Sequence, residues 1–464
     1  MKRKITEELL KWKNRIDHKP LILNGARQVG KSYILEEFGK QYYNNYIRIS
    51  LDLVPNVRDF LSRNIEPLEI IAYLESMYNI RIIPHETLVI LDEIQDCKRA
   101  LLALKYFRED HPEYDIAAAG SLLGIAVNKG EKKDENEPDK KQEEESFSYP
   151  VGKVDELTLY PMDFEEFLWA MGEDKLMDFI RMCFDKKQPV GQSMHRKIMD
   201  YFRLYLIVGG MPQAIQEYLD TRSFEDVDRV KRQILNLYHN CIDRYAGKYA
   251  TKVNSIYEAI PAQLQLHDHK FQLADLDKNA RFRNYASAFF WLRDAKMVNL
   301  AFNTTEPSIG LGLNQSDNSL KCYMNDTGLM ISHAFDERGI VSEQLYQKIL
   351  KDKLEVNAGM LMENIVGQML TALGCKLFFY SNSSRENKED RMEIDFLISK
   401  KAITSRHNIS PIEVKSSTGF NTISLEKCIK KYGSHLAQAY IVHTGDLEKD
   451  GDYLYIPLYM VPCL

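Results

Sequence analysis

The stretch NGARQVGKS, at residues 24–32, constrains the fold of this 464-residue chain more than any other part of the sequence. It fits the pattern G-x-x-x-x-G-K-[ST], whose fixed positions are Gly25, Gly30, Lys31 and Ser32. Small residues allow backbone N–H groups to close around a phosphate, while the lysine reaches the β and γ oxygens and the serine hydroxyl ligates Mg²⁺. The apolar run LIL before the stretch and the amphipathic run KSYILEEFGK after it therefore predict a strand, a phosphate-binding loop and a helix.

Two further apolar runs end in polar residues that suit a nucleotide site. TLVILDE ends in Asp92, which is expected to hold Mg²⁺ through water, and in Glu93, which would orient or deprotonate the attacking water. IAAAGS ends in Ser121, a candidate sensor of the γ-phosphate, although Gly-Ser also commonly ends a strand. We therefore predict ATP and Mg²⁺ as cofactors. The alternative is a glycine-rich turn accompanied by a capping pair of acids.

The predicted nucleotide site has catalytic, metal-binding and phosphate-binding members. The catalytic residues are Lys31 and Glu93, and the metal ligands are Ser32 and Asp92. The residues expected to bind the nucleotide are Gly25, Ala26, Arg27, Gln28, Val29, Gly30, Lys31, Ser32, Tyr33 and Ser121. Arg27 contacts a phosphate in one interpretation and pairs with a neighbouring acid in the other.

Short apolar runs alternate with helical patterns at the start of the sequence. The runs LILN, YIRISLD, TLVILDE and IAAAGS are separated by patterns such as SYILEEFGKQY, which predicts a parallel α/β sheet for a domain at residues 1–154. Residues 128–148, NKGEKKDENEPDKKQEEESFS, have almost no apolar side chains to offset the entropy of ordering. We expect a flexible charged insertion there.

The rest of the chain divides by pattern into three parts. Residues 155–250 are helical and are expected to form a lid. Residues 251–335 combine the helix RNYASAFFWLRD with strands of a hairpin and predict a winged-helix-like unit. Residues 336–464 return to mixed α and β. The predicted fold class is therefore α/β and multidomain.

Composition excludes several classes of protein. The net charge of −6 and a pI near 6.1 argue against a protein that coats nucleic acid through bulk positive charge. No apolar run approaches the roughly 20 residues that span a bilayer, and the basic N-terminus lacks the apolar stretch of a signal peptide. Seven cysteines without a CxxC pair fit neither a disulfide framework nor a zinc site. We expect a cytoplasmic protein with reduced cysteines and no membrane partner.

The final part of the sequence reads as a helix, three strands, a helix and a strand. This αβββαβ order is the common core of restriction-endonuclease-like nucleases, which need acids converging on a divalent metal and a lysine near the scissile phosphate. Glu363 lies on the first helix, and a spacing of two places Glu393 with Asp395, and Glu413 with Lys415, on single strand faces. The predicted metal ligands are Glu363, Asp395 and Glu413, and the predicted catalytic pair is Glu413 and Lys415. An ordinary ion pair is the alternative for that pair.

These motifs together resemble the bacterial and archaeal AAA-type P-loop ATPases that carry an uncharacterised restriction-endonuclease-like C-terminal domain. The resemblance covers nearly the whole chain, in the order KPLILNGARQVGKS, VILDEIQD, LYPMDFEEFL, YLIVGGMPQAI, CYMNDTGLM, GMLMENIVGQML, EIDFLI and PIEVKSS. It implies that phosphate and Mg²⁺ are bound by Gly25, Lys31 and Ser32. It also implies that Asp92 and Glu93 form the Walker B pair.

The resemblance also assigns GGMP, at residues 209–212, to the helical lid. In related signal-transducing ATPases such a proline touches the adenine, which nominates Pro212, although a turn between two helices explains the same residues. Many relatives carry Gly-Arg before LYPMDFEEFL, where a charge-neutralising finger is expected, but this chain has Lys153 in YPVGKVDELTLY. Lysine lacks the bidentate fork of arginine, so the identity of any finger stays open.

A basic and aromatic cluster is the candidate contact with DNA. Its members are Lys278, Arg281, Arg283 and Arg293, with Phe282, Tyr285, Phe289, Phe290 and Trp291 between them. Basic side chains suit phosphates and aromatic rings suit stacking, but aromatic residues at this spacing more often form a core. DNA is therefore one candidate partner, and an intramolecular clamp on the ATPase is the favoured alternative for this helix.

Three functions fit the sequence. The leading hypothesis is a Mg²⁺-dependent ATPase whose nucleotide state controls a C-terminal nuclease-like domain that binds or cleaves DNA. The alternative is a slow nucleotide-dependent signalling switch that recognises a protein partner or a nucleic acid and has a catalytically silent C-terminal domain. The third is a ring-forming remodeller, which predicts a homo-oligomer.

Overall fold

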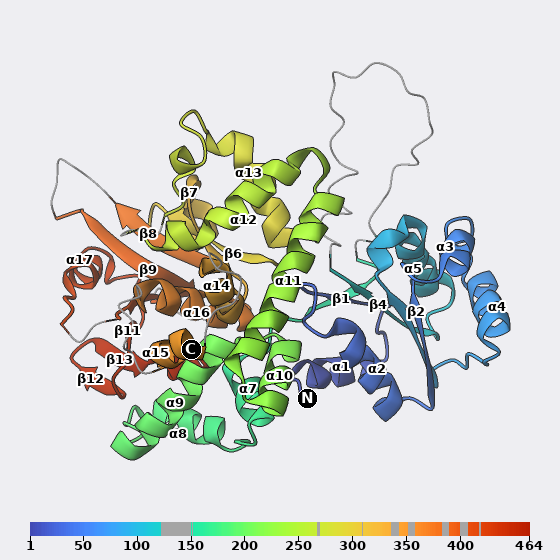
Figure 1. The fold of residues 1–464 in the computed structure, drawn as a ribbon, viewed down its shortest axis with the longest axis horizontal. Coiled ribbons are helices and arrows are strands. Elements are labelled where there is room, and N and C mark those ends of the chain that lie inside the picture. The colour runs from blue at the N-terminus through green and yellow to red at the C-terminus, as the bar shows by residue number, and fades with distance from the viewer. Residues whose placement is uncertain are drawn as a thin grey trace. The chain divides into compact units, whose positions relative to one another are not determined.

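A computed structural model of the chain describes residues 1–121, 150, 152–266, 270–308, 310–335, 343–350, 358–382, 389–399, 407–416 and 419–464 (Figure 1). The charged insertion predicted at 128–148 lies outside the described residues. The chain divides into two compact units. The N-terminal unit comprises Lys2–Tyr160 with Asp294–Lys296, and the C-terminal unit comprises Met1, Pro161–Arg293 and Met297–Leu464.

A five-stranded sheet forms the centre of the N-terminal unit. Its strands are β1 (Leu21–Asn24), β2 (Asn45–Ser50), β3 (Thr87–Asp92), β4 (Asp115–Gly120) and β5 (Asp155–Thr158). They lie in the order β2-β3-β4-β1-β5, and every neighbouring pair is parallel. The parallel α/β sheet predicted from the alternating apolar runs is thus confirmed.

Five helices accompany this sheet in the described residues of the N-terminal unit: α1 (Ile5–Asn14), α2 (Lys31–Tyr42), α3 (Pro55–Leu61), α4 (Pro67–Tyr78) and α5 (Lys98–Asp110). Every residue of β3 and β4 is buried, as expected for parallel strands covered on both faces. Ile49 and Leu91 of the sheet share one apolar core with Leu74 of α4 and Leu104 of α5. Burying each such side chain contributes roughly 1.5–3 kcal/mol, which fixes the strands that carry the site.

The strand β5 corrects the predicted boundary between the first two domains. Residues 155–158 were expected to open the helical lid, but they pair with β1, so that Leu21 lies opposite Asp155 and Leu23 opposite Leu157. The sequence DELT gives no apolar run because this edge strand is only partly buried. The helical part of the chain begins after it.

Helices dominate the first half of the C-terminal unit. They are α7 (Phe164–Ala170), α8 (Leu176–Lys186), α9 (Gln192–Val208), α10 (Pro212–Thr221), α11 (Phe224–Tyr245), α12 (Ala250–Leu264) and α13 (Phe282–Asp294). A capping box starts α7, because Asp163 accepts from the Glu166 amide while Glu166 accepts from the Asp163 amide. The helical region expected from the sequence is therefore present.

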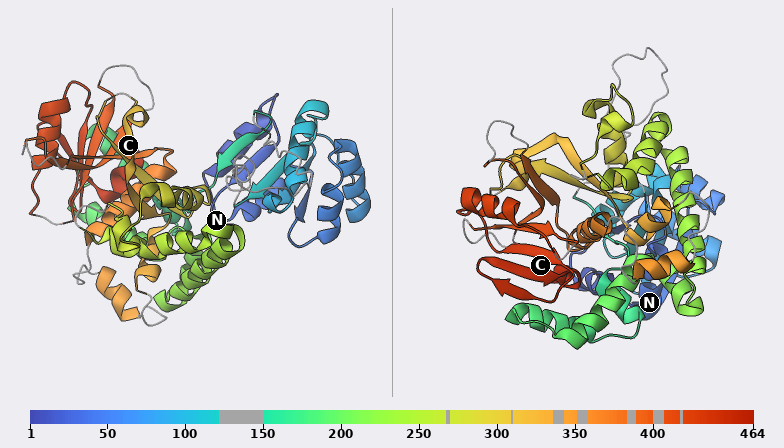
Figure 2. Two further views of the ribbon diagram at one scale, coloured as in Figure 1. Left: turned by 90° about the horizontal axis from the view of Figure 1, so that it is seen from above. Right: turned by 60° about the vertical axis from the view of Figure 1, so that its left-hand side comes forward.

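An eight-stranded sheet forms the second half of this unit (Figure 2). Its strands are β6 (Val298–Thr304), β7 (Gln315–Met324), β8 (Leu377–Asn382), β9 (Met392–Ser399), β10 (Ile409–Val414), β11 (Ala439–His443), β12 (Glu448–Asp450) and β13 (Tyr453–Pro457), in the order β12-β13-β11-β10-β9-β8-β6-β7. The helices that belong to this part are α14 (Thr327–Ala334), α15 (Glu343–Leu350), α16 (Ala358–Ala372) and α17 (Ile423–Tyr432). From α16 to β11 the elements follow the order helix, three strands, helix and strand that the sequence predicted.

The hairpin expected in a winged-helix-like unit belongs to this sheet. β6 and β7 pair antiparallel, but β6 also pairs in parallel with β8, with Ala301 opposite Leu377. The boundary predicted between residues 335 and 336 therefore separates strands of one sheet. The physical reason is that β6 is apolar and buried, and it needs a partner at its second edge.

A crossing of glycines explains part of the motif GGMP. A Cβ atom at Gly209 would lie 2.3 Å from Asp326 Oδ1, and a Cβ atom at Gly328 would lie 2.6 Å from Gly209 Cα. Asp326 Oδ2 accepts a 2.6 Å hydrogen bond from the Gly210 amide, and its Oδ1 caps α14 through the Leu329 amide. The two segments, far apart in sequence, can approach this closely only because both carry glycine.

A buried ion pair joins the segment between α1 and β1 to the start of β4 in the N-terminal unit. His18 Nε2 lies 2.6 Å from Asp115 Oδ1 at the start of β4, and both side chains are buried. The hydrogen bond to Asp115 raises the pKa of His18 above its ordinary value of 6.5, against the opposing effect of burial. The protonated imidazole therefore favours the folded state.

Two expectations from composition concern cysteines and membranes. All seven cysteines lie in the described part of the chain, and none forms a disulfide. Within the described ranges, no helix is long and apolar enough to span a lipid bilayer.

We predict that the N-terminal unit loses stability as the pH rises from 6.5 through the raised pKa of His18. The imidazole has a higher pKa in the folded state than in the unfolded state, so it stabilises the fold only while it is protonated. Urea unfolding followed by Trp12 fluorescence measures this, because the Trp12 ring packs edge-on against His18 at 4.9 Å. Trp169→Phe and Trp291→Phe remove the other two tryptophans. His18→Gln should flatten the dependence; an unchanged pH profile in that variant would contradict the assignment.

A second prediction concerns the glycine crossing. Gly209→Ala should cost about 2 kcal/mol more than Gly191→Ala, because both positions have positive φ (83° and 88°) but only the Cβ at 209 meets another atom. Nothing lies within 4 Å of a Cβ at Gly191, so that variant reports backbone strain alone. Denaturant unfolding of both variants gives the difference, and equal losses would show that the crossing tolerates a methyl group.

Candidate functional site

The loop at residues 25–30 joins β1 to the first residue of α2, as the sequence predicted. Gln28 and Gly30 have φ of 65° and 91°, the left-handed conformation, so the loop curls before the helix begins at Lys31. Position 25 requires glycine, because a Cβ atom there would lie only 2.4 Å from the carbonyl oxygen of Leu159. The N–H groups at the start of an α-helix have no partners within the helix, so those at the start of α2 can bind an anion.

Two cations hold the inner side of this loop. Lys31 is 8% exposed, and its Nζ donates to the carbonyl oxygens of Gly25 at 3.0 Å and Ala26 at 2.8 Å. Arg3 is also buried, and its guanidinium donates to the carbonyl oxygens of Val29 at 3.0 Å and Tyr160 at 2.7 Å. The sequence reasoning missed Arg3, because a basic residue before a helix gives no sign that it is buried.

Asp92 and Glu93 lie at the carboxyl end of β3, where the sequence placed them. Asp92 is 4% exposed, and its Oδ2 accepts from Arg48 Nη2 at 2.6 Å and Nε at 3.1 Å. Arg48, on β2, also donates from Nη1 to Glu36 Oε1 at 2.6 Å. Glu93 adopts a positive φ of 51° and accepts a hydrogen bond from the side chain of Gln95. The predicted Mg²⁺ ligand is thus held by a partly exposed arginine that the sequence did not single out.

Ser121 follows β4, which lies between β1, the strand before the loop, and β3, the strand that carries Asp92. The sheet order β3-β4-β1 therefore puts Ser121 between the loop and Asp92, and Ser121 Oγ accepts from Arg27 Nε at 3.4 Å. Parallel strands present their carboxyl ends at one edge of a sheet, which is where ligands bind in open α/β sheets. The candidate nucleotide site is this edge.

Other predicted residues belong to the other unit, already have partners or are exposed. Pro212 is the first residue of α10 and belongs to the C-terminal unit. Lys153, the position considered for a finger, forms a 2.8 Å ion pair with Glu109. Tyr33 is exposed on the first turn of α2.

In the C-terminal unit, the predicted acids surround a lysine that the sequence reasoning missed. Lys321 Nζ lies 2.8 Å from Glu363 Oε1, 3.4 Å from Glu393 Oε1 and 3.7 Å from Asp395 Oδ1. Burial lowers and the three carboxylates raise the pKa of Lys321, with a net rise above its usual range. The sequence feature that could have identified Lys321 is its position inside the otherwise apolar strand sequence LKCYM.

Glu413 and Lys415 form an ion pair, which was the alternative to a catalytic role for these two residues. Lys415 Nζ lies 2.8 Å from Glu413 Oε2, and Glu413 is 2% exposed. Burial raises the pKa of Glu413 to about 7, while Lys415 opposes the rise. Burial and the neighbouring Glu363 likewise raise the pKa of Asp395.

The arrangement of the acids decides whether they could hold a metal. Among the described residues, no group of three or more His, Cys, Asp or Glu side chains is arranged so that it could hold a metal ion. The acids Glu363, Glu393 and Asp395 converge on Lys321 instead. The side-chain set in the C-terminal unit therefore does not fit the metal that its sequence implied.

The basic and aromatic cluster on α13 divides between surface and core. Lys278, Arg281, Arg283 and Arg293 are exposed. Tyr285, Phe289 and Trp291 are buried, so they are not available for stacking on bases. The core interpretation of these three rings is therefore correct.

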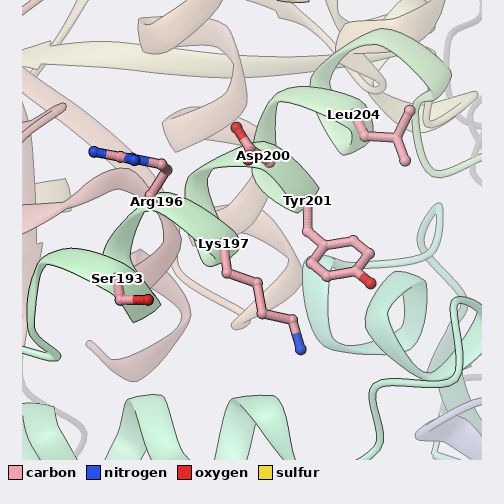
Figure 3. Close-up of a pocket in the computed structure, with 6 residues that line it drawn as sticks. All are labelled: Ser193, Arg196, Lys197, Asp200, Tyr201 and Leu204. Atoms are coloured by element: carbon pink, nitrogen blue, oxygen red, sulfur yellow. The ribbon is translucent and has the colours of Figure 1, made fainter.

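A separate cavity lies along α9 and is lined by Ser193, Arg196, Lys197, Asp200, Tyr201 and Leu204 (Figure 3). Lys197 and Tyr201 both contact Glu173 Oε1, at 2.7 and 2.9 Å. These lining residues include none of those predicted to carry function.

The fold and the loop define a P-loop nucleotide-binding domain, and comparison with known families agrees. Residues 17–137 match a family described as "AAA domain". The chain therefore carries an AAA-type P-loop domain. Residues 199–338 match "Domain of unknown function (DUF8612)" and residues 358–461 match "Domain of unknown function (DUF4143)". A search of curated proteins gives no match.

Two solved structures are similar over much of the chain. AMPPCP-bound DnaA from Aquifex aeolicus is 14% identical, with a TM-score of 0.27, over 61% of this chain and 81% of the DnaA chain. The Orc1 protein of Aeropyrum pernix in complex with DNA is 12% identical, with a TM-score of 0.23, over 72% of this chain and 91% of the other. Scores this low add nothing to the assignment made from the loop and the family match.

Lys31→Ala should weaken ATP binding at least about tenfold, because a charged hydrogen bond contributes roughly 1.5–3 kcal/mol. Titration with a fluorescent ATP analogue measures the affinity. Lys40→Ala is the matched control, since Lys40 lies exposed on the same helix and pairs with Glu37. Equal ATP affinities in the two variants would show that Lys31 does not contribute to ATP binding.

Proposed function

We propose that this protein is a Mg²⁺-dependent ATPase whose site lies at the carboxyl edge of the five-stranded sheet. The observation that carries the proposal is the meeting of three strand ends there: the loop after β1, Asp92 on β3 and Ser121 after β4. Lys31 and the first turn of α2 would hold the phosphates, and Ser32 and Asp92 would hold Mg²⁺. Bound Mg²⁺ supplies neutralisation of phosphate charge.

The residues of the chain have distinct tasks in this proposal. Arg3 fixes the Val29 carbonyl and so keeps the loop curled when its N–H groups bind phosphate. Arg48 compensates the charge of Asp92, and because its side chain is 36% exposed it can leave the carboxylate at small cost in solvation. Glu93 accepts the proton of the attacking water or orients that water.

Glu93→Gln should reduce phosphate release at least about 100-fold while leaving ATP affinity near that of wild type, since loss of a general base typically costs that factor in rate. Measurements of released phosphate and of nucleotide affinity on the same preparations separate the two effects. Glu69→Gln, an exposed acid on α4, is the control. Wild-type protein that releases no phosphate, or a Glu93→Gln variant that matches wild type, would sink the proposal.

Two roles for the C-terminal unit follow from this ATPase. In the first, nucleotide state controls a nuclease-like unit that binds or cleaves DNA. In the second, a slow switch signals through a catalytically silent unit, and Lys321 among Glu363, Glu393 and Asp395 specifically favours it. DNA as a partner rests on the exposed basic residues near α13 in either case.

The same phosphate assay distinguishes these roles when it is run with and without DNA. A switch should hydrolyse slowly alone and faster with its partner, whereas metal-dependent cleavage of supercoiled or single-stranded DNA would support the nuclease. Light scattering with and without ATP tests the ring-forming alternative.

A further inference from the structure

Two of the acids predicted to bind a metal in the C-terminal unit, Glu363 and Asp395, lie together with Glu393 around a cation of the chain itself. Lys321 is 1% exposed, and its Nζ is within 4 Å of carboxylate oxygens of Glu363, Glu393 and Asp395. An ammonium so far from water needs compensating charge, and these acids provide it. The cluster is therefore built around the lysine.

Strand register explains how Lys321 reaches acids on other elements. Lys321 on β7 lies opposite Ala301 on β6, which in turn lies opposite Leu377 on β8. Cross-strand partners share a face, and the small side chain at 301 leaves space for the lysine to extend across the sheet. Its Nζ, which contacts the acids, lies 5.3 Å from the centre of the Phe379 ring.

The lysine and a metal shared by the three acids would compete for the same position between them. A carboxylate oxygen ligates Mg²⁺ or Ca²⁺ at roughly 2.0–2.6 Å, which is the space that the ammonium fills. Glu363 Oε1 also accepts from Tyr323 Oη at 2.5 Å, and Asp395 Oδ2 accepts from the Val414 amide at 2.9 Å. A metal shared by these acids would have to displace the buried ammonium of Lys321.

We propose that Lys321 takes the place of a divalent metal in this cluster, so that the C-terminal unit lacks metal-dependent phosphodiesterase activity, and that removing the lysine opens a divalent-cation site on Glu363 and Asp395. The proposal refines the silent-switch role proposed above. Its geometry involves only the C-terminal unit, so it stands or falls independently of ATP hydrolysis.

The test measures Mn²⁺ binding by electron paramagnetic resonance in the full-length, nucleotide-free chain. Asp92→Asn serves as the background, because it removes the carboxylate proposed to hold a metal in the N-terminal unit while Arg48 keeps Glu36 as a partner. This background should bind no Mn²⁺ that depends on Glu363. Adding Lys321→Met should create one Mn²⁺ site at least about 10-fold tighter than any in the background, because a unit positive charge has been removed from the acids.

Two matched variants define the outcome. Glu363→Gln added to Lys321→Met should abolish the new site, whereas Lys415→Met in place of Lys321→Met should create none, because Lys415 forms its ion pair with Glu413 and leaves Lys321 among the acids. A folded Lys321→Met variant that binds no Mn²⁺ would overturn the claim of a latent site. Should that variant fail to fold, the background alone decides: Mn²⁺ binding that Glu363→Gln removes would show that the lysine does not exclude metal.

Discussion

Parallel pairing of β1 between β4 and β5 is the constraint on which the nucleotide site depends. Together with the pairing of β3 to β4, it brings the ends of β1, β3 and β4 to one edge, so that residues almost 100 positions apart meet. The loop then adds a local demand, because Gly25 must pass under the Leu159 carbonyl before the chain can start α2. Arg3 and Lys31 satisfy the carbonyl groups that this turn leaves on its inner side. The anion-binding edge is thus a product of sheet order and loop curvature together.

Both units pair their candidate metal acids with cations of the chain, but the two pairings differ in accessibility. Arg48 beside Asp92 is about one-third exposed, so water can solvate its guanidinium if a metal takes over the carboxylate. Lys321 is enclosed, and its release from Glu363 would leave an ammonium in an apolar interior. Exchange between a resident cation and a metal is therefore inexpensive at Asp92 and costly at Glu363. This contrast is the physical basis for proposing metal binding in the N-terminal unit alone.

The motif GGMP illustrates how a structural demand can resemble a functional signature. Gly209 and Gly210 are both enclosed by neighbouring atoms, Asp326 at the first and the Met162 backbone at the second. Pro212 begins α10, a position where its missing N–H has no helical partner to lose. All three residues thus have a packing or backbone role within the C-terminal unit that accounts for their presence.

Local patterns in the sequence predicted the parallel sheet, the loop at residues 25–30 and the strand-end acids Asp92 and Glu93. They succeeded because each depends on residues adjacent in sequence: apolar runs that are buried on both faces, glycines at a tight turn, and a helix that starts at Lys31. The order of helices and strands from α16 to β11 was predicted for the same reason. Weak or polar strands such as β5 carried too little apolar pattern to be found.

The sequence by itself determined which chemical groups this protein has and on which elements they lie. Only the tertiary structure decided their partners, because pairing of charges depends on strand register and on contacts between residues far apart in sequence. Arg48 reaches Asp92 across a parallel ladder, and Lys321 reaches Glu363 past the small side chain of Ala301. A sequence pattern of acids and a lysine is the same whether the acids bind a metal or a buried ammonium, and the fold distinguishes the two by where it places that lysine.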